Sequence, residues 1–288
     1  MKFLHVVPGL EKAGNGIAVA ARLVADRQAA ELVDAGVFSK GRVAFADCDE
    51  VWVHGCWLPA VWLSCWRVLR EGKRLVRMPH GNYDPVRLKY HGWKKRLAGP
   101  IERFLSRRAS RIVATCDMEK AWVCAYLDER LCPVAVMDLK DFFDLGGPGR
   151  QDPRPGEALH LLYLGRRHPL KGLKYLEAAV AGREDVALRL VGNAFGEEKE
   201  KVWDWCDVLV LPTLSENFGL VVAEALARGK RAITTDGAPA WGEGGDYGGR
   251  LIYLKGYRDG SPETKVALLK AAVSSLAARP TKNAGEVS

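Results

Sequence analysis

Two glutamates that stand eight residues apart, Glu216 and Glu224, lie in a segment typical of a strand, a tight loop and a helix. The apolar run Val208–Leu211 predicts the strand. The helix is expected to begin near Asn217 and to end at Gly229, a residue type that often terminates helices. Eight residues rise about 12 Å along a helix. That is about the reach from a sugar, across a pyrophosphate, to a ribose, so the carboxylates could accept hydrogen bonds from hydroxyl groups at both ends of a nucleotide sugar.

The start of this predicted helix favours an anion between the two carboxylates. Phe218 and Gly219 stand there, and a glycine allows backbone N–H groups to approach a bound group closely. A helix N-terminus also carries partial positive charge, which stabilises phosphate. The segment therefore suits a nucleoside-diphosphate sugar.

The segment LPTLSENFGLVVAEALARG (residues 211–229) resembles the Glu-x7-Glu signature of family-4 retaining glycosyltransferases with the GT-B fold. The preceding strand and the surrounding Pro-Thr and Asn-Phe-Gly make this resemblance specific. Other similar segments follow in the family's order: LLYLGRRHPLKGLKYLEAA (161–179), ITTDGAPAW (233–241), VHGCW (53–57) and RMPHGNYDPVRLKYHGWKK (77–95). The last two resemble a subgroup that builds bacterial surface polysaccharides such as lipopolysaccharide.

The resemblance implies a role for each matching residue. Glu216 would bind hydroxyl groups of the transferred sugar, and Arg166 and Lys171 would clamp the donor diphosphate without a metal ion. Such fixed cations stabilise the charge that builds on a departing phosphate in retaining transfer. The residues expected to act in catalysis are His80, Arg166, Lys171 and Glu216. The residues expected to bind the donor are Gly14, Asn15, Gly16, Asn193, Asn217, Phe218, Gly219, Leu220 and Glu224.

Plainer interpretations remain open for several of these residues. His80 could be a hydrogen-bonded turn histidine, Arg166 and Lys171 could belong to a solvated loop, and residues 14–16 could form an ordinary turn. Asp47 and Asp49 form a D-x-D pattern like the metal site of the other major transferase fold, but a single D-x-D before a strand is common by chance. We expect no metal ion and no cofactor besides the donor substrate.

Short apolar runs alternate with helical patterns along the whole chain. The expected strands are Leu4–Val7, Val51–His54, Arg74–Arg77, Arg111–Ala114, Leu159–Leu164, Ala187–Val191, Val208–Leu211 and Arg231–Thr234. Continuous apolar strands separated by helices indicate parallel sheets that are covered on both faces. The predicted class is therefore α/β, with two Rossmann-like, doubly wound domains of the GT-B type facing a cleft.

Composition places the boundaries between these parts. Glycine and proline cluster between residues 146 and 157, which is typical of a linker. We therefore expect an N-terminal acceptor-side domain over 1–145, a linker over 146–157 and a nucleotide-sugar-binding domain over 158–262. A C-terminal helix over 263–279 could cross back to the first domain, and residues 280–288 would form a tail.

The chain has 288 residues, of which 48% are hydrophobic and 27% charged, and this excludes wholesale disorder. Its net charge of +8 suits partners that carry phosphate. Seven cysteines without a C-x-x-C pair argue against a disulfide framework or a zinc site and favour a reducing cytoplasm. No stretch resembles a signal peptide or a transmembrane helix, so the expected location is cytoplasmic, with a peripheral position on the inner face of the plasma membrane as an option.

Residues 87–111 hold nine Lys or Arg residues and one glutamate. Trp93, Leu97, Ile101 and Leu105 recur at helical spacing, which predicts an amphipathic helix. Two interpretations remain open. The apolar side could pack in the core of the first domain, or the helix could dock on anionic lipid, where each nearby Lys or Arg contributes about 1 kcal/mol.

Two segments depart from the family pattern: the part of the first domain after Ala30 is abbreviated, and so is the connection before the Glu-x7-Glu strand. Only AFGEEKEKVWDWC (194–206) separates two predicted strands, where the family normally has a further strand–helix unit at the nucleotide base. The choice of uridine as the base therefore follows family frequency alone. The predicted function is retaining transfer of a sugar to a cell-surface glycan or a lipid-linked acceptor. The alternative is an inactive subunit that binds sugar nucleotides or scaffolds glycan assembly, and no motif supports nucleic-acid binding.

Overall fold

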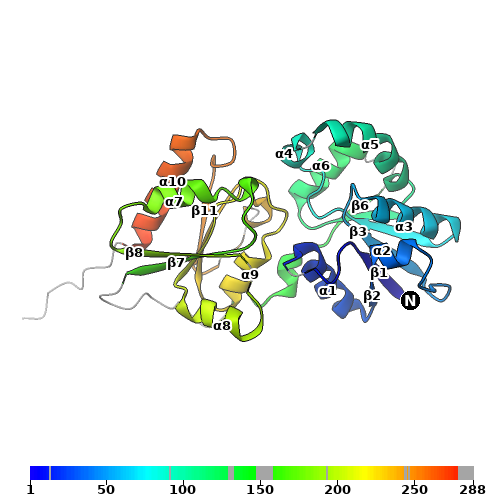
Figure 1. Cartoon of the computed structure of the whole chain (residues 1–288), viewed down its shortest axis with the longest axis horizontal. Coiled ribbons are helices and arrows are strands. Elements are labelled where there is room, and N and C mark those ends of the chain that lie inside the picture. Colours follow the sequence, from blue (N-terminus) through cyan, green and yellow to red (C-terminus); the bar gives the residue numbers. More distant parts are fainter. Residues whose placement is uncertain are drawn as a thin grey trace, which may run out of the picture. The chain divides into compact units, whose positions relative to one another are not determined.

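The computed structural model describes residues 1–277 apart from residues 13, 91, 129–132, 147–157, 193, 243–244 and 246. The chain divides into two units (Figure 1). The first unit comprises Met1–Leu145 together with Ser215–Ala223 and Ala238–Gly244. The second comprises Gly146–Leu214, Glu224–Gly237 and the described residues from Gly245 onward.

The first unit contains a sheet of six parallel strands in the order β2-β1-β3-β4-β5-β6. The strands are β1 (Phe3–Val7), β2 (Glu31–Asp34), β3 (Glu50–His54), β4 (Arg74–Met78), β5 (Arg111–Ala114) and β6 (Val134–Val136). The helical segments are α1 (Gly16–Gln28), α2 (Ala35–Ser39), α3 (Pro59–Arg70), α4 (Pro85–Lys89), α5 (Gly92–Ser106), α6 (Asp117–Leu127), η2 (Leu139–Phe142) and η4 (Pro239–Trp241).

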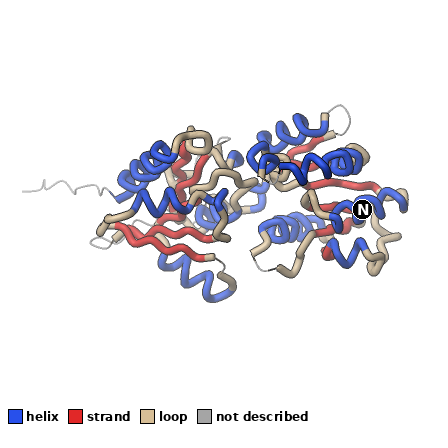
Figure 2. The backbone as a smooth tube through the Cα atoms, turned by 45° about the horizontal axis from the view of Figure 1, so that its top comes forward, coloured by secondary structure: helices blue, strands red, loops and turns tan. Residues whose placement is uncertain are grey.

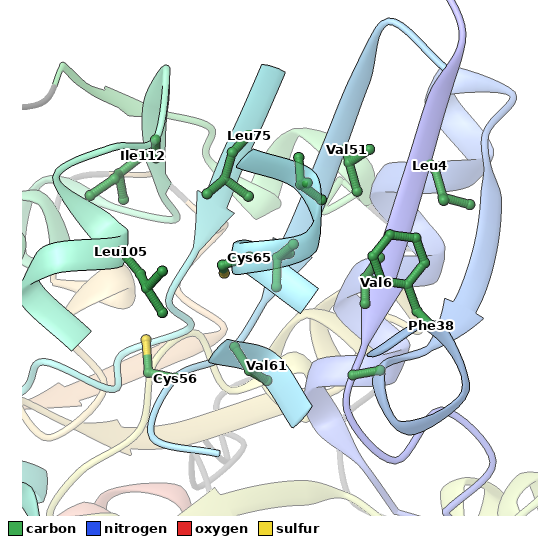
Figure 3. Packing of buried hydrophobic residues seen from close by; sticks show 14 of the residues in the cluster. Leu4, Val6, Phe38, Val51, Cys56, Val61, Cys65, Leu75, Leu105 and Ile112 are labelled. Carbon is green, nitrogen blue, oxygen red and sulfur yellow. The ribbon is translucent and has the colours of Figure 1, made fainter. Parts of the chain in front are cut away.

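Alternating side chains of this sheet form separate cores on its two faces, as expected for strands with a two-residue period. Leu4 and Val6 of β1 join a large cluster with apolar residues of α2, α3 and α5 (Figure 3). Val7 joins a smaller cluster that includes Ala18 and Ala21 of α1. Helix α1 therefore covers the opposite face from α3.

The second unit contains five parallel strands in the order β11-β10-β9-β7-β8. They are β7 (Leu159–Leu164), β8 (Val186–Val191), β9 (Val208–Leu211), β10 (Arg231–Thr235) and β11 (Leu251–Leu254). The helical segments are η3 (Pro169–Lys171), α7 (Leu173–Val180), α8 (Gly196–Trp205), α9 (Leu220–Ala227), whose first four residues belong to the first unit, and α10 (Pro262–Ala277). In each unit, helices lie on both sides of the strands (Figure 2).

These two sheets confirm the predicted α/β class with two doubly wound domains. All eight expected strands are present, and the structure adds β2, β6 and β11, which lie at sheet edges. Helix α9 begins at Leu220, three residues later than expected, because Gly219 adopts a left-handed backbone with φ of +74°. Helix α8 alone connects β8 to β9 through the described part of that segment.

Several predicted boundaries stay predictions. Residues 147–157 of the expected linker and the tail 280–288 lie outside the described residues. Helix α10 packs against α7 in the second unit, where Arg183 Nη1 donates a hydrogen bond of 2.9 Å to Ser274 Oγ. The crossing of this helix toward the first domain stays a prediction. No helix of the described residues has the length and apolar character needed to span a membrane.

Candidate functional site

Loops that follow neighbouring strands of the second unit are tied to one another at the carboxyl end of the sheet, where ligands of such folds bind. The loop after β7 carries Leu170, whose carbonyl accepts hydrogen bonds from Leu214 N at 2.8 Å and Thr213 Oγ1 at 3.1 Å. Gly172 ends this loop with φ of +66°, and a Cβ added there would lie 2.0 Å from Pro212 O. The loop after β7 and the exit of β9 therefore touch through backbone.

The loop after β10 joins the same arrangement. Thr235 Oγ1 donates a hydrogen bond to Thr213 O, and a Cβ added to Gly237 would lie 2.1 Å from that oxygen. Two of the predicted diphosphate residues lie on the β7 loop. Arg166 is exposed and Lys171 is half-buried at the end of η3. The second unit therefore holds both cations on a loop tied to the end of β9, with Ser215 and Glu216 next in the chain.

In the first unit, the loop after β4 contacts the segment that begins at Ser215. Ser215 Oγ donates a hydrogen bond to Asp84 Oδ2 and accepts one of 3.1 Å from Arg87 Nε. Arg87 also forms an ion pair of 3.7 Å with Glu216 Oε1. A Cβ added to Gly81 would lie 2.9 Å from the Cβ of Asn217. The structure thus brings the predicted sugar-binding Glu216 next to the loop that carries His80.

His80 is buried and adopts φ of +55°, a conformation that costs a non-glycine residue about 1–2 kcal/mol. Strain of this kind gathers at functional sites. Its Nε2 lies 2.8 Å from His54 Nδ1. Burial, and next the nearby Arg87 guanidinium, lower the pKa of His80 to about 3. At neutral pH the ring is therefore uncharged and cannot serve as a cation for phosphate.

The backbone beside His80 is held by a buried carboxylate that the sequence analysis missed. Glu119 accepts hydrogen bonds from Gly81 N and, at 2.7 Å each, from Thr115 N and Thr115 Oγ1. Burial raises the pKa of Glu119, although these donors oppose the shift. No spacing in the sequence links Glu119 to Gly81, because the contact depends on how α6 meets the β4 loop.

The segment at the start of α9 contains further donor-binding candidates of the first unit. Phe218 O accepts a hydrogen bond from Trp241 Nε1, and the two rings pack at 5.2 Å between centroids. The side chain of Asn217 is buried, and its Oδ1 has no hydrogen-bond partner among the described residues. Leu220 is half-buried at the first turn of α9. An unpaired buried acceptor at a helix start is a group that a ligand donor could satisfy.

Glu224 lies in the second unit and has a partner that the sequence did not indicate. Lys199 Nζ, on α8, lies 2.7 Å from Glu224 Oε2, and both side chains are mostly buried. Lys199 belongs to the short segment that replaces the family's usual strand–helix unit. The shortened connection therefore supplies a cation beside the carboxylate that is expected to bind ribose.

The loop before α1 holds the first three donor-binding candidates. Asn15 caps the helix by accepting from Ile17 N at 3.2 Å, and its Nδ2 donates to Pro8 O and Gly9 O at 2.8 and 2.9 Å. These bonds fully occupy its amide hydrogens, so Asn15 shapes the loop. Gly14 has φ of +69°, and a Cβ added to Gly16 would meet nothing within 4 Å. Asn193 lies outside the described residues.

The described residues contain no group of three or more His, Cys, Asp or Glu placed to hold a metal ion. Asp49 of the D-x-D pattern instead accepts a hydrogen bond of 2.7 Å from Lys2 N. The sequence analysis did not identify Asp84 and Arg87 as candidates, although both lie in the segment of residues 77–95 that resembles the family. Their partner Ser215 is more than 100 residues away, so no local pattern reveals the pairing.

Two family models match the chain. The Glycosyltransferase Family 4 model matches residues 14–136, and the Glycosyl transferases group 1 model matches residues 150–258. No curated protein sequence matches the chain.

Several solved structures are similar to it. Sucrose-phosphate synthase from Thermosynechococcus elongatus has a TM-score of 0.68 at 14% identity and covers 96% of this chain and 91% of its own. HepE from Anabaena, in complex with UDP-glucose, has a TM-score of 0.65 at 14% identity, with coverages of 96% and 90%. The trehalose-6-phosphate synthase OtsA has a TM-score of 0.63 at 11% identity, with coverages of 95% and 91%. At these identities the similarity shows a shared fold.

Proposed function

Because the chain belongs to the GT-B glycosyltransferases, with a Glycosyltransferase Family 4 domain followed by a Glycosyl transferases group 1 domain, we propose a specific reaction for it. The enzyme transfers a sugar from a UDP-sugar, with retention, to a hydroxyl group of a cell-surface glycan or a lipid-linked acceptor. The observation that carries this proposal is the backbone hydrogen bond of 2.8 Å from Leu214 N to Leu170 O. It holds the loop of Arg166 and Lys171 at the exit of β9, next in the chain to Glu216.

In this proposal, the positively charged residues bind the diphosphate and the carboxylates bind hydroxyl groups of the donor. Arg166 and Lys171 stabilise the negative charge that builds on the departing diphosphate, together with the backbone N–H groups at the start of α9. Glu216 accepts hydrogen bonds from hydroxyl groups of the sugar, while Arg87 pairs with its carboxylate and orients it. No metal ion has a role in this scheme.

Glu224 binds the ribose hydroxyl groups of the donor, with Lys199 holding the carboxylate in place. Uridine as the base is supported by HepE, which is similar in fold and was solved with UDP-glucose. The short α8 connection leaves fewer residues to select the base than the family usually has.

Thermal unfolding with UDP, GDP, ADP and their sugar conjugates tests donor binding. A ligand at 100 times its Kd adds about 2.7 kcal/mol of stability, so UDP should raise Tm clearly, with or without EDTA. Glu224→Ala should abolish the shift. A protein that responds to none of these nucleotides would instead be the inactive, scaffolding subunit.

Release of UDP from UDP-sugars in the presence of extracted glycan acceptors tests turnover. Lys171→Ala should lower kcat by about 100-fold, the usual effect of removing one group that stabilises transition-state charge. Lys174→Ala is the matched control, because Lys174 is exposed and three residues further along the same segment. Equal rates for both variants would remove Lys171 from the mechanism.

We also propose that the first unit docks on an anionic membrane through α3 and α5. Of the apolar stripe, only Leu105 packs in the core; Trp93, Leu97 and Ile101 are 65%, 74% and 49% exposed. Helix α5 instead turns Glu102 inward, where it forms a buried ion pair of 2.9 Å with Arg77. The exposed face therefore presents apolar side chains that the fold itself does not bury.

Side chains of α3 continue this apolar surface. An entirely apolar groove of about 610 Å³ is lined by Pro59, Trp62, Leu63, Trp66, Pro100, Ile101, Phe104 and Leu105. Exposed Lys94, Arg96, Arg107 and Arg108 lie on or directly after α5, and the one acidic residue of residues 87–111 is the buried Glu102. Apolar groups rimmed by cations match the interface of an anionic bilayer.

Flotation with phosphatidylglycerol and phosphatidylcholine vesicles tests this surface. We expect binding to the anionic vesicles that weakens with salt and is lost in Leu97→Ser/Ile101→Ser and in Lys94→Glu/Arg96→Glu. Phe195→Ser, which removes an exposed aromatic ring from the second unit, is the control and should bind normally. Equal binding to both vesicle types, or a doubled mass in solution that the serine variant abolishes, would contradict membrane docking.

A further inference from the structure

Three buried histidines of the first unit form one continuous chain of hydrogen bonds. His5 Nδ1 lies 2.8 Å from His54 Nε2, and His54 Nδ1 lies 2.8 Å from His80 Nε2. At the other end, His5 Nε2 lies 2.9 Å from the Gln28 side-chain oxygen. The side chains of His5 and His54 are fully buried, and His80 is 4% exposed. The chain thus runs from the end of α1 to the candidate site.

The sheet places these rings in a diagonal row. His5 on β1 is paired with Trp52 on β3, and His54 on β3 is paired with Met78 on β4. Each next histidine stands two residues beyond the pairing partner of the previous one. Because side chains of a strand alternate with a period of two, His5 and His54 lie on the same side of the sheet as diagonal cross-strand neighbours. His80 lies in the loop directly after β4, where its left-handed backbone turns its ring to His54.

With the oxygen of the Gln28 amide facing His5 Nε2, the row has only one consistent arrangement of protons. A neutral imidazole carries a single N–H, so a ring that bonds on both sides donates on one and accepts on the other. The Gln28 oxygen can only accept, so His5 donates from Nε2. His54 and then His80 must follow the same direction, each donating from Nε2. The Nδ1 of His80 is left without a proton.

Burial keeps the rings in the neutral state that this argument needs. It lowers the pKa of His5 to about 4, with the Gln28 hydrogen bond opposing the shift. It also lowers the pKa of His54 well below its ordinary value, helped by the other two rings. With His80 also uncharged at neutral pH, the row carries hydrogen bonds and no net charge.

We propose that Gln28, His5 and His54 are positioning residues that set the tautomer of His80, so that its Nδ1 presents a lone pair to a substrate hydroxyl group. This rests on the proposed function, in which Glu216 binds the transferred sugar, because the loop that carries His80 contacts Glu216 through Arg87 and Asn217 through Gly81. The Gln28 amide, at the far end of the row, therefore decides whether Nδ1 of His80 accepts or donates a hydrogen bond at the site. A lysine at position 28 would donate to His5 and reverse every bond, which would make Nδ1 of His80 a donor.

Two-bond ¹⁵N–¹H NMR spectra of histidine-labelled protein read these tautomers directly and need no substrate. In the wild type we expect all three rings to be neutral and protonated at Nε2 from about pH 6 to pH 8. Gln28→Glu should keep this pattern, and Gln28→Lys should move the proton of His80 to Nδ1. A wild-type His80 that is protonated at Nδ1 would overturn the proposal without any variant.

Kinetics then test the role of the row. Gln28→Lys should lower kcat/KM about tenfold, the value of one hydrogen bond, at unchanged Tm. Gln28→Glu and the control Asp26→Asn, an exposed change in the same turn of α1, should retain activity. A reversed tautomer with unchanged kcat/KM would overturn the positioning role. If the wild type turns over no sugar donor, the proposed function fails, and with it the substrate role of Nδ1, while the NMR result still decides whether the row has the inferred direction.

Discussion

The carboxyl end of the second sheet depends on residues that have no side chain. Gly172 and Gly237 both face backbone oxygens at about 2 Å from where a Cβ would stand, namely Pro212 O and Thr213 O. Real Cβ atoms do not approach oxygen so closely, so any larger residue would push the loops apart. These contacts keep the β7 and β10 loops against the exit of β9.

Gly172→Ala should destabilise the second unit by more than about 2 kcal/mol, since it adds a backbone collision to the cost of a left-handed alanine. Gly182→Ala is the matched control. Gly182 has a similar φ of +74°, but a Cβ there would meet nothing within 4 Å. Urea unfolding of both variants checks this, and equal losses of stability would show that the Pro212 contact is unimportant.

At the scale of elements, α5 is attached to the first sheet through polar groups. Glu102 accepts hydrogen bonds from Trp62 Nε1 at 2.6 Å and Tyr83 Oη at 2.7 Å in addition to its ion pair with Arg77. Burial raises the pKa of Glu102, but Arg77 and these donors together hold it below its ordinary value. Because these buried polar contacts hold α5 on the sheet, the apolar side chains on its other face can remain exposed.

Glu102→Gln should cost about 3–5 kcal/mol of the free energy of unfolding, because it leaves the Arg77 guanidinium buried without its counter-ion. Since the pKa of Glu102 is lower in the folded protein, its contribution is complete above the unfolded pKa of about 4.5 and is lost as the pH falls below it. The difference between wild type and variant should therefore shrink in acid.

Urea unfolding at several pH values measures this difference. Glu200→Gln is the control, because Glu200 pairs with Arg228 at 2.8 Å on the surface, and its removal should change stability little. A Glu102 variant that is as stable as this control at neutral pH would contradict the anchoring role.

At the scale of the whole molecule, neither unit is one continuous stretch of sequence. Ser215–Ala223 and Ala238–Gly244 belong to the first unit, although the strands around them belong to the second. Each unit also carries a buried thiol that can report on its unfolding, Cys65 in the first and Cys206 in the second. Burial raises the pKa of Cys65 in the first unit to about 11 and that of Cys206 in the second to about 12.

These thiols should stay unreactive in the native protein, because only the thiolate reacts quickly and both sulfurs are buried. Pulse labelling in rising urea, read residue by residue by mass spectrometry, should modify the half-buried Cys48 and Cys124 first. UDP should delay labelling of Cys206 if the nucleotide binds the second unit. Labelling of Cys206 in the native state as fast as that of Cys48 would contradict the packing described.

The sequence by itself determined the class of the fold and most of its strands. Strands buried on both faces require continuous apolar runs, and all eight runs that met this rule are strands. The three missed strands, β2, β6 and β11, lie at sheet edges, are only partly buried and are only three or four residues long, so their short apolar stretches do not stand out in the sequence. The Glu-x7-Glu segment was also readable, because loop, glycine and helix are local features.

The tertiary structure alone decided which side chains meet. Asp84 and Ser215 are 131 residues apart, and the histidine row depends on the register of β1, β3 and β4. The outward direction of the α5 apolar stripe depends on the buried partner of Glu102. Periodicity in a sequence shows that one face of an element is apolar. It does not show what that face contacts, because partners are set by register and packing between segments that are distant along the chain.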